Sequence, residues 1–225
     1  MPSATVEDYL KALYQLEQEE GAKTRVKDIA ALLKVSLPSV TTMMKSLADS
    51  GYVQRTAYRG VNLTDQGRLA ALRVIRNHRL IELFLVEVLG YTWDEVHAEA
   101  ERLEHAMSDT LTNRIDKYLG YPRVDPHGDP IPDADGRIEK VQTKSVLEFP
   151  EKTKQSVERV MEQAADVLQF LSSKGIYPGV EIEIDRLDPF DGPIWLIVDG
   201  ETIALSRSLA HRVHLAVNTD TAENP

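Results

Sequence analysis

Two short segments with helical periodicity, joined by a tight turn, restrict the fold of this chain more than any other feature. Residues 26–33 repeat apolar side chains at helical spacing, and residues 37–50 do so again after only three intervening residues. Ser36 is a suitable N-cap for the second segment. Pro38 fits its first turn, because the N–H that proline lacks would have no intrahelical partner there. The spacing predicts a helix-turn-helix.

A basic hairpin is predicted directly after these two helices. Residues 52–56 and 61–63 alternate like strands around residues 57–60, which places Arg59 at the tip. A hairpin in this position is a wing, and in a winged helix-turn-helix the second helix enters the major groove of DNA. Short helices with a hairpin also occur in other small domains. If DNA is bound, the side chains that we expect to face it are Arg25, Ser36, Pro38, Ser39, Thr41, Thr42, Lys45 and Arg59.

The charge of the chain is unevenly distributed. The net charge is -10, yet residues 21–64 carry seven lysines and arginines against two aspartates. A basic module attached to an acidic remainder suits phosphate contact at one end and cation capture at the other. Ordinary solvated surface charge is the alternative interpretation.

Composition excludes several other classes of protein. The chain has no cysteine, so it has no disulfide framework, and any metal held by side chains must be held through oxygen and nitrogen. No apolar run approaches the twenty residues that cross a bilayer, and residues 1–6 lack the features of a signal peptide. We therefore expect a cytoplasmic protein without a membrane partner.

Potential metal ligands lie on two predicted helices. On a helix over residues 64–89, which Thr64 caps, His78 and Glu82 stand four residues apart and share one face. Such a pair alone is usually an ordinary solvent-exposed pair.

A second predicted helix, over residues 92–105, opens with a capping box in which Thr92 pairs with Glu95. On it, four side chains fall within an arc of about 100° beside an apolar stripe; they are His97, Glu101, Glu104 and His105. Carboxylates and imidazoles next to a core are costly unless a cation or a basic partner neutralises them. The pattern favours a divalent cation, although a lysine or arginine from elsewhere is an alternative.

The last third of the chain predicts a separate module. Residues 141–149 resemble a strand and residues 153–171 a helix, and three further strands follow at residues 180–184, 194–198 and 201–205. Short strands with tight turns between them favour a small barrel. The histidines of this region and of the preceding linker are expected at the surface; they are His127, His211 and His214.

Several segments together resemble the diphtheria toxin repressor family of metal-dependent regulators, and specifically its manganese-responsive type. They are residues 7–10, 78–82, 96–97, 104–109 and 126–132. The resemblance covers essentially the whole chain. It implies a mainly α fold with small β parts: a winged helix-turn-helix domain (1–64), a helical dimerisation and metal-binding domain (65–140) and an SH3-like, FeoA-like β-barrel (141–225).

The resemblance also implies two metal sites. The primary, activating site would use Asp8, Glu101, Glu104 and His105. The ancillary site would use His78, Glu82 and His97, with Gln163 and Asp166 of the C-terminal domain as further ligands.

Three positions depart from relatives within that family. Iron-responsive members have methionine and cysteine where this chain has Asp8 and Glu101, and carboxylates suit manganese better than sulfur does. Small manganese sensors have an acid where this chain has Lys11, which argues for two separate sites rather than a binuclear cluster.

The expected function is that of a repressor, not an enzyme. Mn(2+) would act as co-repressor for a homodimer on an inverted repeat in double-stranded DNA. An Fe(2+)-responsive regulator of the same family is one alternative, and a winged-helix regulator that senses an organic ligand is another. A metalloenzyme is disfavoured because the chain lacks a His-Glu-x-x-His segment and a glycine-rich phosphate loop.

Overall fold

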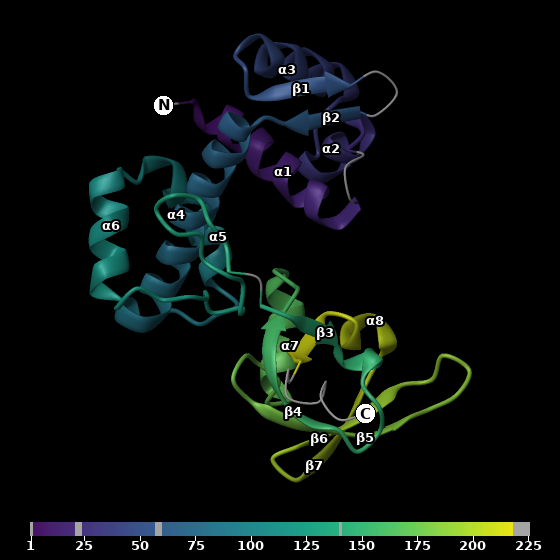
Figure 1. Ribbon diagram of the computed structural model, residues 1–225. Coiled ribbons are helices and arrows are strands. Elements are labelled where there is room, and N and C mark those ends of the chain that lie inside the picture. The colour runs from purple at the N-terminus through teal and green to yellow at the C-terminus, as the bar shows by residue number, and fades with distance from the viewer. Residues whose placement is uncertain (1, 21–23, 57–59, 140, 218–225) are drawn as a thin grey trace, which may run out of the picture. The chain divides into compact units, whose positions relative to one another are not determined.

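The computed structural model describes residues 2–20, 24–56, 60–139 and 141–217 (Figure 1). The chain divides into two compact units. The first comprises Met1–Ile81, Glu101–Tyr121 and Ile131–Ile138, and the second comprises Glu82–Ala100, Pro122–Pro130 and Glu139–Pro225. Helices and a small antiparallel sheet dominate different parts of the chain, so the predicted fold class is confirmed.

The first unit begins with the predicted helix-turn-helix. Its elements are α1 (Ala4–Glu20), α2 (Val26–Leu33), α3 (Leu37–Asp49), β1 (Val53–Thr56) and β2 (Gly60–Leu63). In Figure 1, α1, α2 and α3 lie beside the two-stranded hairpin. Helix α1 begins at Ala4, where the hydroxyl of Ser3 accepts a hydrogen bond from the backbone N–H of Val6. The predicted hairpin tip at residues 57–59, including Arg59, lies outside the described residues.

Local capping explains the turn between α2 and α3. Lys34 adopts a left-handed conformation with φ of 55° and ends α2. Two residues later, the Ser36 hydroxyl accepts a hydrogen bond from Ser39 N–H and starts α3, with Pro38 in the first turn. The two helices then bury one apolar cluster with α1 and the hairpin, which includes Leu10, Ile29, Val40, Met44 and Val61. The helix-turn-helix prediction is therefore correct in its local chemistry.

Helix α4 (Asp65–Leu89) leads out of this domain and continues into the second unit. Thr64 caps it as predicted, since its hydroxyl accepts from Gly67 N–H at 3.1 Å. Further elements of the middle region are α5 (Val96–Leu103), a 3-10 turn η1 (Glu104–Ala106) and α6 (Asp109–Tyr118). The helix predicted over residues 92–105 is thus shorter than expected, because α5 tightens into η1 just where Glu104 and His105 begin.

The second unit contains an antiparallel sheet with the strand order β3-β8-β4-β5-β6-β7. Its elements are β3 (Thr143–Ser145), η2 (Val146–Glu148), β4 (Lys154–Val160), α7 (Ala165–Ser173), β5 (Glu181–Leu187), β6 (Ile194–Val198), β7 (Glu201–Leu205), α8 (Arg207–Ala210) and β8 (Val213–Ala216). Burial alternates along β6: Ile194, Leu196 and Val198 are buried, and the two residues between them are partly exposed. These three side chains belong to an apolar core that α7 also covers with Leu168 and Leu171.

The helix predicted over residues 153–171 is wrong in its first half. Residues Lys154–Val160 form β4, which pairs with both β5 and β8, and the helix begins only at Ala165. Val157 and Val160 are three residues apart, a spacing that suits a helix as well as a bulged strand, and the register shifts between Val157 and Arg159. Pairing with distant strands therefore overrides local helix propensity. The strand predicted over residues 141–149 is likewise reduced to β3, and η2 follows it.

Within the described residues, no helix is long and apolar enough to cross a membrane.

The packing of α4 against Tyr52 and β2 generates the first prediction. A Cβ atom added at Gly67 would lie 2.0 Å from the carbonyl oxygen of Tyr52 and 3.1 Å from Leu63. We therefore expect Gly67→Ala to lower the free energy of unfolding by about 1–3 kcal/mol, as overpacking does. Helix propensity alone predicts the opposite, a gain of about 1 kcal/mol.

Chemical denaturation of both proteins measures this difference. Gln66→Ala, at an exposed position one residue earlier on α4, is the control and should stay close to the wild type. A Gly67→Ala protein more stable than the wild type would contradict the described contact between α4 and Tyr52.

Candidate metal centre

Three of the predicted ligands gather in the first unit. Asp8 lies on α1, Glu104 and His105 lie on η1, and one oxygen or nitrogen atom of each falls within 4.8 Å of the others. His105 Nε2 is 2.9 Å from Asp8 Oδ1 and 3.4 Å from Glu104 Oε1. Two carboxylates and an imidazole at such distances form a donor set for a divalent cation of hard or borderline character.

Glu104 lies at the centre of this group and its side chain is fully buried. The 3-10 geometry of η1 is fixed from behind, because the side-chain amide of Asn77 donates to the backbone carbonyl of Glu104 at 3.1 Å. Asn77 in turn accepts a hydrogen bond from the hydroxyl of Thr112 on α6 at 2.8 Å. A buried chain of hydrogen bonds therefore holds the backbone of Glu104 between α4 and α6.

Glu7 is a residue of the centre that the sequence analysis did not identify. Its carboxylate lies 2.6 Å from His105 Nδ1, on the opposite side of the ring from Asp8. Burial lowers the pKa of His105, but the hydrogen bond with Glu7 and the charges of Glu104 and Asp8 outweigh it, so the pKa is raised. Glu7 also fixes the ring so that Nε2 faces the other carboxylates.

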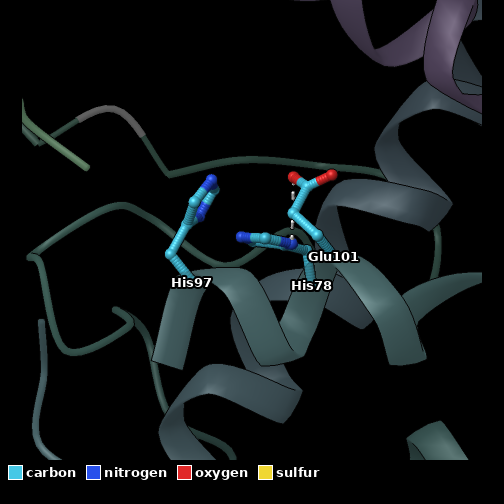
Figure 2. A group of neighbouring side chains, drawn as sticks. All are labelled: His78, His97 and Glu101. Atoms are coloured by element: carbon cyan, nitrogen blue, oxygen red, sulfur yellow. Dashed lines mark ion pairs between the residues drawn. The ribbon is translucent and has the colours of Figure 1, made fainter. Parts of the chain in front are cut away.

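Lys11 also contacts Glu104. Its ammonium nitrogen is 2.8 Å and 3.0 Å from the two oxygens of Glu104, and 2.7 Å from Oε1 of Glu101. His78 Nδ1 lies 2.5 Å from Glu104 and 3.8 Å from Glu101. Figure 2 shows His78 and Glu101 facing one another, with His97 one turn before Glu101 on α5. Glu101, the fourth predicted primary ligand, is thus paired with Lys11 and lies outside the group formed by Asp8, Glu104 and His105.

A second group of carboxylates and imidazoles lies in the second unit. Glu82, Asp125 and His127 bring one donor atom each within 4.8 Å of one another, and all three residues are buried. His97 Nδ1 is 3.2 Å from Glu82 Oε1, so two of the predicted ancillary ligands do meet. His78, the third, contacts Glu104 as described above.

The expectation that His127 is a surface residue is wrong, since its side chain is 1% exposed. His127 Nε2 donates to the carbonyl of Trp93 at 2.8 Å, and Nδ1 lies 3.8 Å from Glu82. Burial lowers the pKa of His127, but the nearby negative charges of Glu82 and Asp125 more than compensate, so the pKa is raised.

The burial of His127 has a backbone cause. Gly128 has φ of 85° and approaches β4 so closely that a Cβ there would lie 2.0 Å from the carbonyl oxygen of Glu158. This contact presses the linker segment onto the sheet. Residues 126–132 resemble the family's segment in sequence, but without the sheet nothing in the sequence indicates that Asp125 and His127 are buried.

Gln163 and Asp166 lie between β4 and the first turn of α7. Each is held locally: Gln163 N–H donates to Glu162, and Asp166 Oδ1 accepts from Val167 N–H. Neither belongs to the carboxylate and imidazole groups found in the described part of the chain. His211 is exposed and His214 is half-buried, with burial lowering the pKa of His214.

Family models match three successive parts of the chain. Residues 1–61 match the N-terminal DNA-binding domain of iron-dependent repressors, and residues 64–133 match the metal-binding and dimerisation domain of the same proteins. Residues 144–217 match the FeoA domain.

Curated relatives and solved structures match nearly the full chain. The iron-dependent repressor IdeR of Mycobacterium leprae is 32% identical, over 93% of this chain and 95% of the relative. The diphtheria toxin repressor of Corynebacterium diphtheriae is 31% identical, over 94% of this chain and 96% of the relative. A manganese-dependent transcriptional repressor in complex with manganese has a TM-score of 0.86 and 37% identity, over 94% of this chain and 99% of the other.

The chain belongs to the diphtheria toxin repressor family of metal-dependent transcriptional repressors.

In this repressor, the DNA-binding domain presents an exposed polar face along α3. Six of the residues predicted to meet DNA are exposed there or just before it: Ser36, Pro38, Ser39, Thr41, Thr42 and Lys45. Thr41 and Thr42 hydroxyls donate back to the carbonyls of Leu37 and Pro38, at 2.9 Å and 3.0 Å. Arg25 is also exposed, at the start of α2.

The contact between Glu7 and His105 generates the second prediction, for the metal-free repressor. Because the folded-state pKa of His105 is raised, the stability it contributes is fully present below its unfolded value of about 6.5 and is lost as pH rises through the folded value. Glu7→Gln weakens this contribution. Its cost in stability should therefore be larger at about pH 5.5 than at about pH 8.5.

Thermal unfolding in chelator at both pH values checks this expectation. Glu87→Gln, at an exposed position of α4, is the matched control and should show no such pH dependence. An equal loss for Glu7→Gln at both pH values would exclude the pairing with His105.

Proposed function

We propose that this repressor responds to manganese and that the cation is its co-repressor. The observation that carries the proposal is the donor set of the primary centre, in which Asp8, Glu104 and His105 offer only carboxylate oxygen and imidazole nitrogen. The chain has no cysteine that could add a sulfur ligand. Such donors suit Mn(2+) better than softer metals. Fe(2+) is the second candidate, because the family includes iron-dependent relatives as well as manganese-dependent ones.

We assign the primary site to Asp8, Glu101, Glu104 and His105. A bound divalent cation would supply positive charge that several carboxylates share. Asp8 belongs to α1, which packs in the same apolar cluster as the helix-turn-helix, whereas Glu104 and His105 belong to η1. Shared ligation would therefore connect the DNA-binding domain to the backbone that Asn77 and Thr112 hold in place.

Without a cation, the carboxylates of Glu7, Asp8, Glu101 and Glu104 repel one another. This repulsion would favour conformations in which α1 and η1 are not tied together, and the DNA-binding domains would sample several separations. Cation binding would favour one of these separations over the others, which is a population shift. Metal binding would thus stabilise the separation of the DNA-binding domains that matches an operator.

We propose a second, ancillary cation site in the second unit. His78, Glu82 and His97 were predicted for it from the sequence. His97 contacts Glu82, and Asp125 and His127 add a buried carboxylate and a buried imidazole near Glu82. Gln163 and Asp166 remain candidates from the C-terminal domain. Cation binding at this site would adjust the affinity for DNA, whereas cation binding at the primary site would turn DNA binding on.

We propose that a homodimer binds an inverted repeat in double-stranded DNA. One winged helix contacts only a half-site, so two copies related by a two-fold axis would need half-sites about 34 Å apart or a multiple of that. The boundaries that we propose are 1–64 for the DNA-binding domain, 65–140 for the dimerisation and metal-binding domain and 141–225 for the SH3-like domain. Arg25 and Arg59 would contact phosphates, and Thr42 and Lys45 would reach base edges. Because chromosomal DNA is the proposed target, we place its action in the cytoplasm.

The experiment that tests this function is a gel-shift titration of the repressor on genomic fragments with Mn(2+), Fe(2+), Co(2+) or Zn(2+). Glu104→Ala removes the buried ligand, and a complete switch needs a preference of about 10⁴-fold, so Mn-dependent DNA affinity should fall by at least about 100-fold. His105→Ala should behave alike, and His97→Ala should only weaken binding.

Glu87→Ala, which removes an exposed carboxylate from α4, is the matched control. A fragment carrying one half-site should bind far more weakly than the inverted repeat. DNA binding by Glu104→Ala with unchanged manganese dependence would refute the assignment of the primary site, and wild-type binding that chelator does not alter would favour a regulator that senses an organic ligand.

Metal preference gives a separate prediction. The double change Asp8→Met with Glu101→Cys replaces two hard ligands by sulfur, so the centre should keep a metal while its preference moves from manganese towards softer ions. Competition between Mn(2+) and Co(2+), measured by metal binding without DNA, checks the shift. An unaltered ratio of the two affinities would exclude Asp8 and Glu101 as ligands.

A further inference from the structure

Lys11 places its ammonium among the residues proposed for the primary site. Its side chain is only 11% exposed, and its ammonium contacts both oxygens of Glu104 and one oxygen of Glu101. His78 Nδ1 is 3.3 Å from the same nitrogen. The lysine comes from α1, the helix that also carries Asp8. The ammonium donates hydrogen bonds to three carboxylate oxygens at 2.7–3.0 Å. It therefore neutralises the oxygens that a metal ion would otherwise bind.

The position of Lys11 divides the proposed ligands into two sets. Asp8, Glu104 and His105 bring one donor atom each within 4.8 Å of one another, whereas Glu101 pairs with Lys11. Lys11 binds Glu104 through both oxygens, and Oε1 of Glu104 is also the oxygen nearest His105. Lys11 therefore holds Glu101 apart from the group of Asp8, Glu104 and His105.

We propose that Lys11 is a tethered competitor of the activating cation, which sets the metal concentration at which the repressor switches. The inference rests on the proposed primary site. Metal entry requires the ammonium to leave Glu101 and at least one oxygen of Glu104, because a divalent cation and an ammonium repel each other when they share a carboxylate. Lys11 thereby stabilises the metal-free form and lowers the apparent affinity for metal.

This competition has a clear physical basis. The buried Glu104 carboxylate would be strongly destabilising if it were left without a positive partner. Lys11 supplies that partner intramolecularly, and so at a high effective concentration. It neutralises the centre enough for the metal-free protein to fold, and a doubly charged ion can still displace it. Removing its charge should make the centre bind metal more tightly.

The first test measures Mn(2+) binding by isothermal titration calorimetry without DNA. The primary binding step is identified as the one that Glu104→Ala abolishes. Lys11→Met keeps the length of the side chain without its charge, and it should bind manganese at this step at least about tenfold more tightly, which corresponds to about 1.4 kcal/mol. Lys11→Gln should show the same change, whereas Lys11→Arg, which keeps the charge, should stay near the wild type.

Lys144→Met, an exposed lysine of β3 in the second unit, is the matched control and should not alter the affinity. Circular dichroism establishes that each variant is folded. Unchanged or weaker manganese binding by folded Lys11→Met or Lys11→Gln overturns the inference.

The second test needs no substitution. Amine acetylation of the wild-type repressor, followed by mass spectrometry, reports how accessible each lysine is. Addition of Mn(2+) should increase the labelling rate of Lys11 severalfold, while that of Lys144 stays constant. Labelling of Lys11 that is unchanged or slower with manganese overturns the inference even if the variants fail to fold.

The two tests separate this inference from the proposed function. If wild-type protein binds manganese and its operator as proposed, but the Lys11 variants and the labelling show no competition, only the role of Lys11 fails. If Glu104→Ala leaves manganese binding unaltered, the primary site itself is wrong.

Discussion

The buried carboxylate of Glu104 is the constraint on which the candidate metal centre depends. A fully buried carboxylate is strongly unfavourable unless positive charge or several hydrogen bonds compensate it. Here Lys11, His78 and His105 surround it. Lys11 also pairs with Glu101, and His105 also pairs with Glu7 and Asp8. The centre is therefore a network of charges in which the position of one cation affects all the others.

The backbone that carries Glu104 makes this network part of the fold. Helix α5 ends at Leu103 and continues as a 3-10 turn, whose first carbonyl accepts a hydrogen bond from Asn77. Thr112 completes the connection to α6. Helix α1 contributes Glu7, Asp8 and Lys11, so the network joins Glu104 to a helix that packs in the apolar cluster of the helix-turn-helix. These contacts all lie within the first unit.

The second unit repeats the same principle with different residues. Glu82, Asp125 and His127 are all buried, and His97 contacts Glu82 at the edge of the group. Gly128 closely approaches Glu158 of β4, so the linker that carries Asp125 and His127 lies against this strand. A small sheet thus determines whether Asp125 and His127, which lie outside it in sequence, are buried or at the surface.

The sequence by itself determined the elements that local chemistry controls. Caps, turn residues and helical periodicity were sufficient for the helix-turn-helix, for α4 and for the last strands, because their signals lie within a few residues of each other. Family resemblance then named Asp8, Glu104 and His105, which do gather. Tertiary structure alone decided the rest: β4 is a strand because β5 and β8 pair with it, His127 is buried because Gly128 meets the sheet, and Glu101 is paired with Lys11 although both were visible in the sequence. In each case the deciding partner is distant in the chain, and periodicity carries no information about distant partners.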